Sequence, residues 1–184
     1  MTEPWLVVID MQAVFGDPGS EWFTPGYVVI EPTVVRLMES FGERVVLTRF
    51  IAPEHPSGTW VPYYQQWPFA LVPHTDPIYE LMPAFAGKQH PVISRTTFGK
   101  WGDELSTIIP ANAAIVLAGV STDCCVLSTA LAAADAGVRV LVCQDACAGL
   151  SESDHLRALE AMSLYAPLIE ITTSQSVLDT LTSD

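Results

Sequence analysis

Positive charge is scarce in this chain. Of its 184 residues, eight are Lys or Arg and 21 are Asp or Glu, which gives a formal net charge of −13. Such a surface repels phosphate groups, so we expect no nucleic-acid or anionic-membrane partner. Only two of the cations are lysines, Lys88 and Lys100. Their rarity makes a lysine that falls beside a candidate site informative.

Long hydrophobic runs are also missing. No uninterrupted apolar stretch is long enough to cross a bilayer. Glu3 and Pro4 lead straight into a strand-like run, so we expect no signal peptide and a cytoplasmic protein. About half of the residues are hydrophobic, which excludes a disordered chain. The length predicts a single domain over residues 1–184.

Cysteine is infrequent and is not spaced as in a metal or disulfide framework. Cys124 and Cys125 are adjacent, and three residues separate Cys143 from Cys147, so no CxxC pair exists. Without an export signal, reduced thiols are expected. The stretch from Arg49 to His55 offers one carboxylate and one imidazole, fewer than the three or more protein donors that a metal site usually needs. The sequence therefore predicts no metal and no cofactor.

Apolar runs alternate with amphipathic stretches along the chain. Because strands that are apolar throughout and separated by helices are typical of a parallel sheet covered on both faces, the pattern predicts an α/β fold. The expected strands are Leu6–Ile9, Arg44–Thr48, Pro91–Ser94, Ala113–Ala118, Val138–Cys143 and Leu168–Thr172. The expected helices are Val28–Phe41, Trp101–Ile109, Val126–Ala136, Ser153–Tyr165 with Ser153 as N-cap, and Ser174–Leu181.

The segment from Pro53 to Pro77 interrupts this alternation. It is rich in proline and aromatic residues and is too long for a plain connection, which favours a functional loop. Its aromatic side chains are candidates for the walls of a substrate site, together with others nearby. The residues assigned to substrate binding are Phe15, Trp60, Tyr64, Trp67 and Trp101.

Residues 115–126 are the most informative stretch. An apolar run ends at Gly119, a short polar turn follows, and Cys124 and Cys125 open a helix-like stretch. A thiol at a helix N-terminus is placed where unpaired N–H groups favour a thiolate and can receive an oxyanion. This pattern indicates nucleophilic thiol chemistry, while two small buried hydrophobes remain the alternative.

Ligands of parallel sheets bind beyond the carboxyl ends of the strands. A carboxylate, a thiol and cations follow the predicted strands and can meet at that edge. The polar residues in question are Asp10, Arg49, Arg95, Cys125 and Asp145, with Lys100 five residues after Arg95.

These residues carry a family resemblance. Leu6-Val-Val-Ile-Asp-Met-Gln-Ala-Val-Phe15, Gly119-Val-Ser-Thr-Asp-Cys-Cys-Val126 with Thr129-Ala130, and Asp145-Ala-Cys-Ala148 together resemble the isochorismatase-like cysteine hydrolases, the superfamily of nicotinamidase and N-carbamoylsarcosine amidase. The resemblance spans nearly the whole chain. It implies a Rossmann-like, three-layer α/β/α sandwich around a six-stranded parallel sheet.

The resemblance also implies a set of catalytic groups. The triad maps to Asp10, Lys100 and Cys125, and a cis peptide maps to Val120–Ser121. The N–H groups of Ser121 and Cys125 would form the oxyanion hole. Many members carry the triad lysine where this chain has Arg95, so Arg95 stays the alternative to Lys100 as the cation. The histidine-containing metal pattern of nicotinamidases is absent from this chain.

The expected function is hydrolysis of a C–N bond in a small-molecule amide through a thioester on Cys125, with Cys124 packed inward. Two alternatives stay open: a vinyl-ether hydrolase of the isochorismatase type, and a non-catalytic flavodoxin-like binding or scaffold protein. The aromatic loop from Pro53 to Pro77 would expose much apolar surface in a monomer, so we expect a homo-oligomer.

Overall fold

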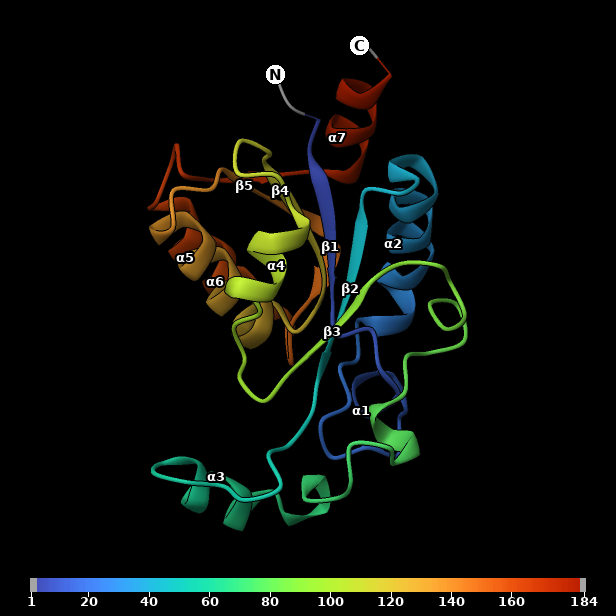
Figure 1. Cartoon of the computed structure of the whole chain (residues 1–184), viewed down its shortest axis with the longest axis vertical. Helices are drawn as coiled ribbons and strands as arrows, with labels where there is room; N and C mark the ends of the chain where they lie inside the picture. The colour runs from blue at the N-terminus through green and yellow to red at the C-terminus, as the bar shows by residue number, and fades with distance from the viewer. Residues whose placement is uncertain (1–2, 183–184) are drawn as a thin grey trace.

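A single six-stranded sheet forms the centre of the computed structural model, which describes residues 3–182 (Figure 1). The strand order is β3-β2-β1-β4-β5-β6, and every neighbouring pair is parallel. The predicted α/β class and the six-stranded parallel sheet are confirmed. The strands are β1 (Trp5–Ile9), β2 (Val45–Phe50), β3 (Val92–Arg95), β4 (Ile115–Val120), β5 (Val140–Ala148) and β6 (Ile169–Thr172).

Helices cover both faces of the sheet and complete the three layers (Figure 1). Successive side chains of a strand point to opposite faces. Leu6 and Val8 of β1 accordingly pack in the core beneath α2 and α7, whereas Val7 and Ile9 pack in the core beneath α4, α5 and α6. The α-helices are α1 (Ala13–Gly16), α2 (Tyr27–Phe41), α3 (Trp60–Gln66), α4 (Asp103–Ile108), α5 (Leu127–Asp135), α6 (Glu152–Ser163) and α7 (Ser174–Leu181).

Most boundaries lie one or two residues from the predicted ones, and three differences are more informative. Strand β5 continues to Ala148 because its pairing with β4 resumes after an irregularity, with Gly119 opposite Cys147. The N-cap of α6 is Ser151, whose hydroxyl accepts the N–H of Asp154, so the assignment of Ser153 was wrong. A π-helical turn, η3 (Thr122–Val126), precedes α5 and contains both adjacent cysteines.

A close backbone approach joins the ends of β1 and β4. A Cβ on Gly119 would lie 2.1 Å from the carbonyl oxygen of Ile9, and Gly119 has a φ of +118°. Only glycine fits both conditions. Asp10, the next residue after Ile9, has a φ of +49°, a left-handed conformation that aspartate tolerates better than most residues. The two strand ends therefore deliver Asp10 and the turn after β4 to the same place.

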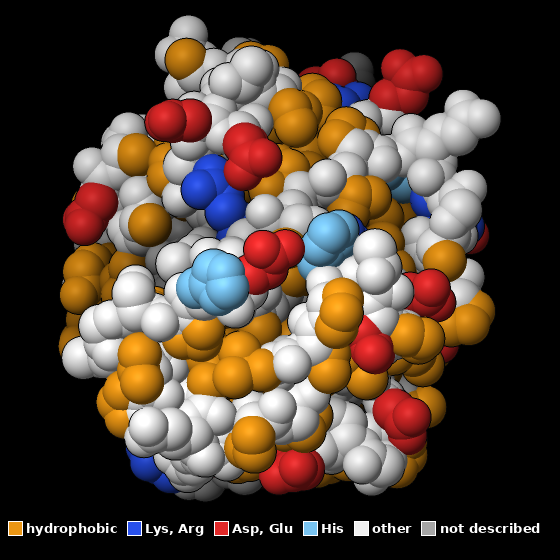
Figure 2. Space-filling view, turned by 60° about the horizontal axis from the view of Figure 1, so that its bottom comes forward, with side chains coloured by type: hydrophobic (Ala, Val, Ile, Leu, Met, Phe, Trp, Pro, Cys, Tyr) orange, Lys and Arg blue, Asp and Glu red, His pale blue; other side chains and the backbone are white. Residues whose placement is uncertain are grey.

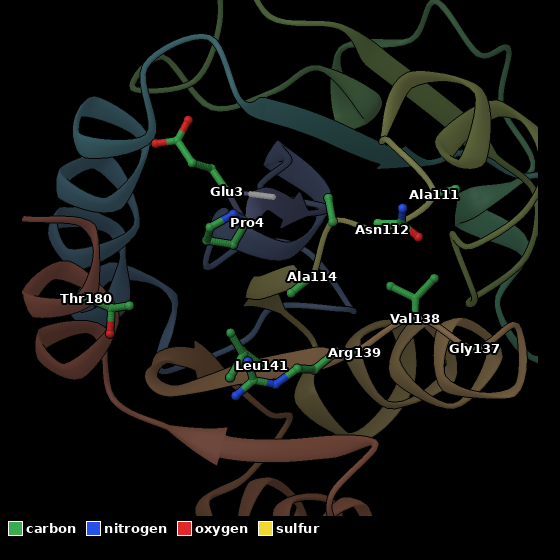
Figure 3. Close-up of a pocket in the computed structure, with 11 residues that line it drawn as sticks. Glu3, Pro4, Ala111, Asn112, Ala114, Gly137, Val138, Arg139, Leu141 and Thr180 are labelled. Atoms are coloured by element: carbon green, nitrogen blue, oxygen red, sulfur yellow. The ribbon is translucent and has the colours of Figure 1, made fainter. Parts of the chain in front are cut away.

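A depression of about 560 Å³ lies at the opposite, amino edge of the sheet (Figure 3). It is lined by the segments that lead into β1, β4 and β5, and most of the side chains there are small. The charged residues on its wall are already paired: Glu3 with Arg44 and Arg139 with Glu170. Among the described residues, no helix is long and apolar enough to cross a membrane.

Candidate active site

A buried ion pair lies at the carboxyl edge of the sheet. Lys100 Nζ is 2.9 Å from Asp10 Oδ2, and both side chains are fully shielded from solvent. A buried charge is tolerated only when it is paired and hydrogen-bonded. Lys100 therefore occupies the cationic place beside Asp10. Arg95 lies elsewhere, with its Nε 3.0 Å from Glu104 Oε2.

Neighbouring residues hold both partners of this pair. The Thr48 hydroxyl donates to Asp10 Oδ1 at 2.7 Å, and the Asp10 N–H donates to Thr48 Oγ1 at 3.2 Å. Lys100 Nζ donates to the carbonyl oxygen of Thr97 at 2.8 Å and lies 5.0 Å from the centroid of the Phe50 ring. These contacts fix the carboxylate and the ammonium in one arrangement.

Cys125 lies against the ion pair, on the π-helical turn after β4. Its thiol is buried beside the charged groups of Asp10 and Lys100. Burial first, and then the charge of Asp10, raise the pKa of the thiol well above its usual value, while Lys100 opposes this shift. Burial therefore favours the protonated form of this group. Desolvation of the buried thiol thus opposes the stabilisation of a thiolate that the N–H groups of a helix N-terminus provide.

Thr129 connects Cys125 to Lys100. Its hydroxyl donates to the Cys125 carbonyl oxygen at 2.6 Å and accepts the Lys100 N–H at 2.9 Å. Thr129 is itself fully buried on α5, one helical turn after Cys125. The backbone that carries the lysine is thereby tied to the turn that carries the thiol.

The turn before the cysteines adopts an unusual backbone. The Val120–Ser121 peptide bond is cis, at the position to which the resemblance points. Ser121 and Cys125 line the same cavity, as the expected oxyanion hole requires. Cys124 also lines this cavity and is partly exposed, so the expectation that it packs inward was wrong. Both cysteines belong to the π-helical turn, which is wider than an α-helical turn, and both line the cavity.

A cavity of about 220 Å³ opens above the thiol. Figure 2 turns this end of the molecule toward the viewer and shows hydrophobic side chains gathered there, with acidic groups among them. Six aromatic side chains contribute to the wall, and its members come from α1, β2, α3, the π-helical turn and the irregular segments between them. The lining residues are Phe15, Glu21, Trp22, Thr24, Phe50, Tyr63, Trp67, Phe98, Ser121, Asp123, Cys124, Cys125 and Leu150.

Two of the five predicted wall residues, Phe15 and Trp67, line the cavity. Trp60 does not, because it packs behind the wall against Tyr63 and Phe98. Tyr64 also lies outside the lining, buried next to Trp60. Trp101 packs instead against the core on the side of α4 and α5. Trp22 and Phe98 were missed, since both lie in irregular segments without periodicity.

The aromatic segment of residues 53–77 folds onto the cavity rather than extending as an open loop. It contains α3 and a short 3-10 turn over Pro68–Ala70. The Tyr79 hydroxyl donates to the carbonyl oxygen of Ala70 and accepts the N–H of Ala52, so it joins the two ends of the segment. Buried Gln12 donates to the carbonyl oxygens of Phe50 and Tyr79 at 2.9 Å each. These bonds hold Tyr63 and Trp67 as part of the wall.

Other strand-end residues have structural partners. Arg49 donates to the Ser94 hydroxyl on the neighbouring strand. Asp145 accepts the N–H and the hydroxyl of Ser174 at the start of α7. Within residues 3–182, no cluster of three or more His, Cys, Asp or Glu side chains could hold a metal ion.

Comparisons with known proteins fit this geometry. The family model of the isochorismatase domain matches residues 4–176. The isochorismatase domain-containing protein 2 of Xenopus laevis is 42% identical over 82 residues, which are 45% of this chain and 38% of that relative's length. The chain thus spans well under half of the curated relative that it matches.

Solved structures extend the likeness over nearly the whole chain. A cysteine hydrolase from Pseudomonas syringae superposes with a TM-score of 0.86 and 22% identity, covering 98% of this chain and 92% of that one. A pyrazinamidase of Pyrococcus horikoshii in complex with zinc superposes with a TM-score of 0.72 and 26% identity, covering 93% and 98%. Since the family model covers nearly all of the sequence, the chain belongs to the isochorismatase family of hydrolases.

Proposed function

We propose that this protein hydrolyses the C–N bond of a small amide through a thioester on Cys125. The observation that carries the proposal is the buried Cys125 thiol beside a fully buried Asp10–Lys100 ion pair, at the base of a cavity with aromatic side chains in its wall. A thiol with an adjacent base and a third group that holds the base is the arrangement used for nucleophilic catalysis. The pyrazinamidase among the similar structures agrees with an amide substrate.

The first half of the reaction forms the acyl-enzyme. Asp10 accepts the proton of Cys125 as the sulfur attacks the carbonyl carbon. The N–H groups of Ser121 and Cys125 stabilise the oxyanion. The C–N bond then breaks, and the proton on Asp10 moves to the departing amine, which leaves as ammonia or a small amine.

The second half releases the acid. Water attacks the thioester carbonyl and gives a proton to Asp10, the C–S bond breaks, and that proton returns to Cys125. Lys100 stays protonated throughout and keeps Asp10 in its anionic form between the steps. Thr48 holds Asp10, and Thr129 holds the backbone of Lys100 and Cys125. Neither threonine lines the cavity, so both are positioning residues.

The test is a panel of small primary amides with ammonia release as the readout. Cys125→Ala abolishes turnover, whereas Cys124→Ala retains the thioester step and changes mainly KM, because Cys124 only lines the cavity. Cys143→Ala, which removes a thiol in β5 outside the cavity, controls for thiol loss in general.

Hydroxylamine added to wild-type turnover traps the acyl group as a hydroxamate, a product that neither a vinyl-ether hydrolase nor a scaffold protein gives. Ammonia release that persists in Cys125→Ala contradicts the proposed nucleophile. A panel in which no amide is turned over contradicts the proposed reaction.

A further inference from the structure

The charged side chains on the cavity wall are all acidic. Glu21 and Asp123 line the cavity, and no Lys or Arg belongs to its lining. The ammonium of Lys100 lies beneath the wall and is already paired with Asp10. A ligand carboxylate or phosphate in this cavity would therefore meet two like charges and no compensating cation.

The remaining wall is built from aromatic faces and edges. Trp22 contacts five neighbouring aromatic rings, and its ring centroid lies 5.0 to 6.2 Å from theirs. The neighbours are Phe15, Phe50, Tyr63, Trp67 and Phe69. Aromatic faces carry partial negative charge and attract cations, most strongly when the cation is an alkylated ammonium that is easily desolvated. Acidic groups beside such rings add to this attraction.

The chemistry at the carbonyl favours the same kind of ligand. An oxyanion in this cavity is destabilised by the charges of Glu21 and Asp123, and the cation that lies nearby, Lys100, is already paired with Asp10. A positive charge carried by the substrate itself, near its carbonyl, would offset the acidic wall while the oxyanion exists.

We propose that the cavity binds a small carboxamide that carries a positively charged, alkylated ammonium group close to the reacting carbonyl, and that it discriminates against carboxylate-bearing amides. The inference rests on the proposed amide hydrolysis for its reaction, although not for its binding preference. The volume of about 220 Å³ is below that of most drug-sized sites and suits a ligand of this size.

Binding is tested first, separately from chemistry. Choline and its neutral isostere 3,3-dimethylbutan-1-ol are titrated into the Cys125→Ala protein by calorimetry. Because a desolvated cation gains from aromatic faces in a way that its isostere cannot, choline is expected to bind about tenfold more tightly or better. Equal or tighter binding of the neutral alcohol overturns the inference.

Turnover by the wild-type protein follows, with trimethylammonioacetamide, its isostere 3,3-dimethylbutanamide and the anion malonamate as substrates. We expect kcat/KM to fall in that order, with no detectable hydrolysis of malonamate. Hydrolysis of the neutral or anionic amide at the same or a higher rate contradicts the inference while leaving amide hydrolysis in place. Preferential binding of choline without turnover of any amide contradicts the proposed reaction and leaves the binding preference.

Variants locate the origin of the preference. Glu21→Gln should reduce the ratio of choline to alcohol affinity by about twofold to fivefold, since an exposed charge contributes modestly. Glu39→Gln, an exposed glutamate on α2 outside the cavity lining, should leave the ratio unchanged. Trp22→Leu should reduce the ratio further than Glu21→Gln. A ratio that is unchanged in both Glu21→Gln and Trp22→Leu overturns the inference.

Discussion

Replacing Lys100 by Met tests the buried ion pair directly. Met keeps most of the length of the side chain but removes the ammonium, which lies 2.9 Å from Asp10 Oδ2 and 5.0 Å from the centroid of the Phe50 ring. Asp10 then has to remain charged without a partner or bind a proton, and the Thr97 carbonyl loses its donor. Removing one member of a buried pair costs about 3–5 kcal/mol of unfolding free energy, a large part of the 5–15 kcal/mol typical of a domain.

The measurement is urea unfolding followed by tryptophan fluorescence, arranged as a double-mutant cycle with Asp10→Asn. Asn keeps an acceptor for the Thr48 hydroxyl and tolerates a positive φ, so the Asp10→Asn, Lys100→Met double variant contains no buried charge. We expect the double variant to be more stable than the sum of the single effects by about 2 kcal/mol or more.

Lys88→Met is the matched control, because Lys88 is the chain's other lysine and is exposed. Its replacement should change stability by less than about 0.5 kcal/mol. A Lys100→Met loss below about 1 kcal/mol, or strictly additive single effects, would refute the reasoning that the pair is buried and coupled.

Three further predictions concern pH, metal and assembly. Burial, aided by Asp145, raises the pKa of Cys143 to about 12 from a usual value of 9.0, so the folded protein keeps a proton that the unfolded chain loses. The stability contributed by this thiol is complete below pH 9 and is lost as the pH rises toward 12. Cys143→Ala should therefore make the unfolding free energy, measured with urea at a series of pH values, fall less steeply in this range, by up to about 1.4 kcal/mol per pH unit. An equally steep fall of the unfolding free energy in the variant argues against this prediction. Amide hydrolysis should survive dialysis against EDTA, and loss of activity that zinc or manganese restores would contradict a metal-free mechanism. Light scattering after size exclusion should give a mass above that of the 20.0 kDa chain, whereas a monomer removes the expected oligomer.

The sheet was predictable because its strands are apolar on both faces. A buried parallel strand needs apolar side chains throughout, so the runs around Val7, Val46 and Val116 are visible without any tertiary information. The convergence of Asp10 and Cys125 followed from the rule that carboxyl ends of parallel strands share one edge. Lys100 could be predicted for a further reason, because the chain contains only two lysines.

The cavity wall was less predictable because loops build it. Trp22 and Phe98 are placed by the path of irregular backbone, which leaves no periodic signal in the sequence. Whether Trp60 and Tyr64 face the cavity depends on the orientation of α3. The hydrogen bonds of Tyr79, which are tertiary contacts, help to set that orientation. The exposure of Cys124 likewise depends on a π-helical turn that an α-helical reading of the sequence does not contain.

Burial raises the pKa of the Cys125 thiol, and yet Cys125 can act as a nucleophile. The two statements are compatible because moving its proton to Asp10 creates no additional buried charge. Before proton transfer, the buried charges are those of Asp10 and Lys100. When the proton of Cys125 moves to Asp10, the negative charge moves to the sulfur and the Lys100 charge stays, so the number of buried charges does not change. The burial that raises the thiol pKa therefore opposes the free ionisation of Cys125 to solvent far more than this internal transfer. Consequently, the raised pKa of the Cys125 thiol is compatible with its activation by Asp10 once a substrate carbonyl is in place.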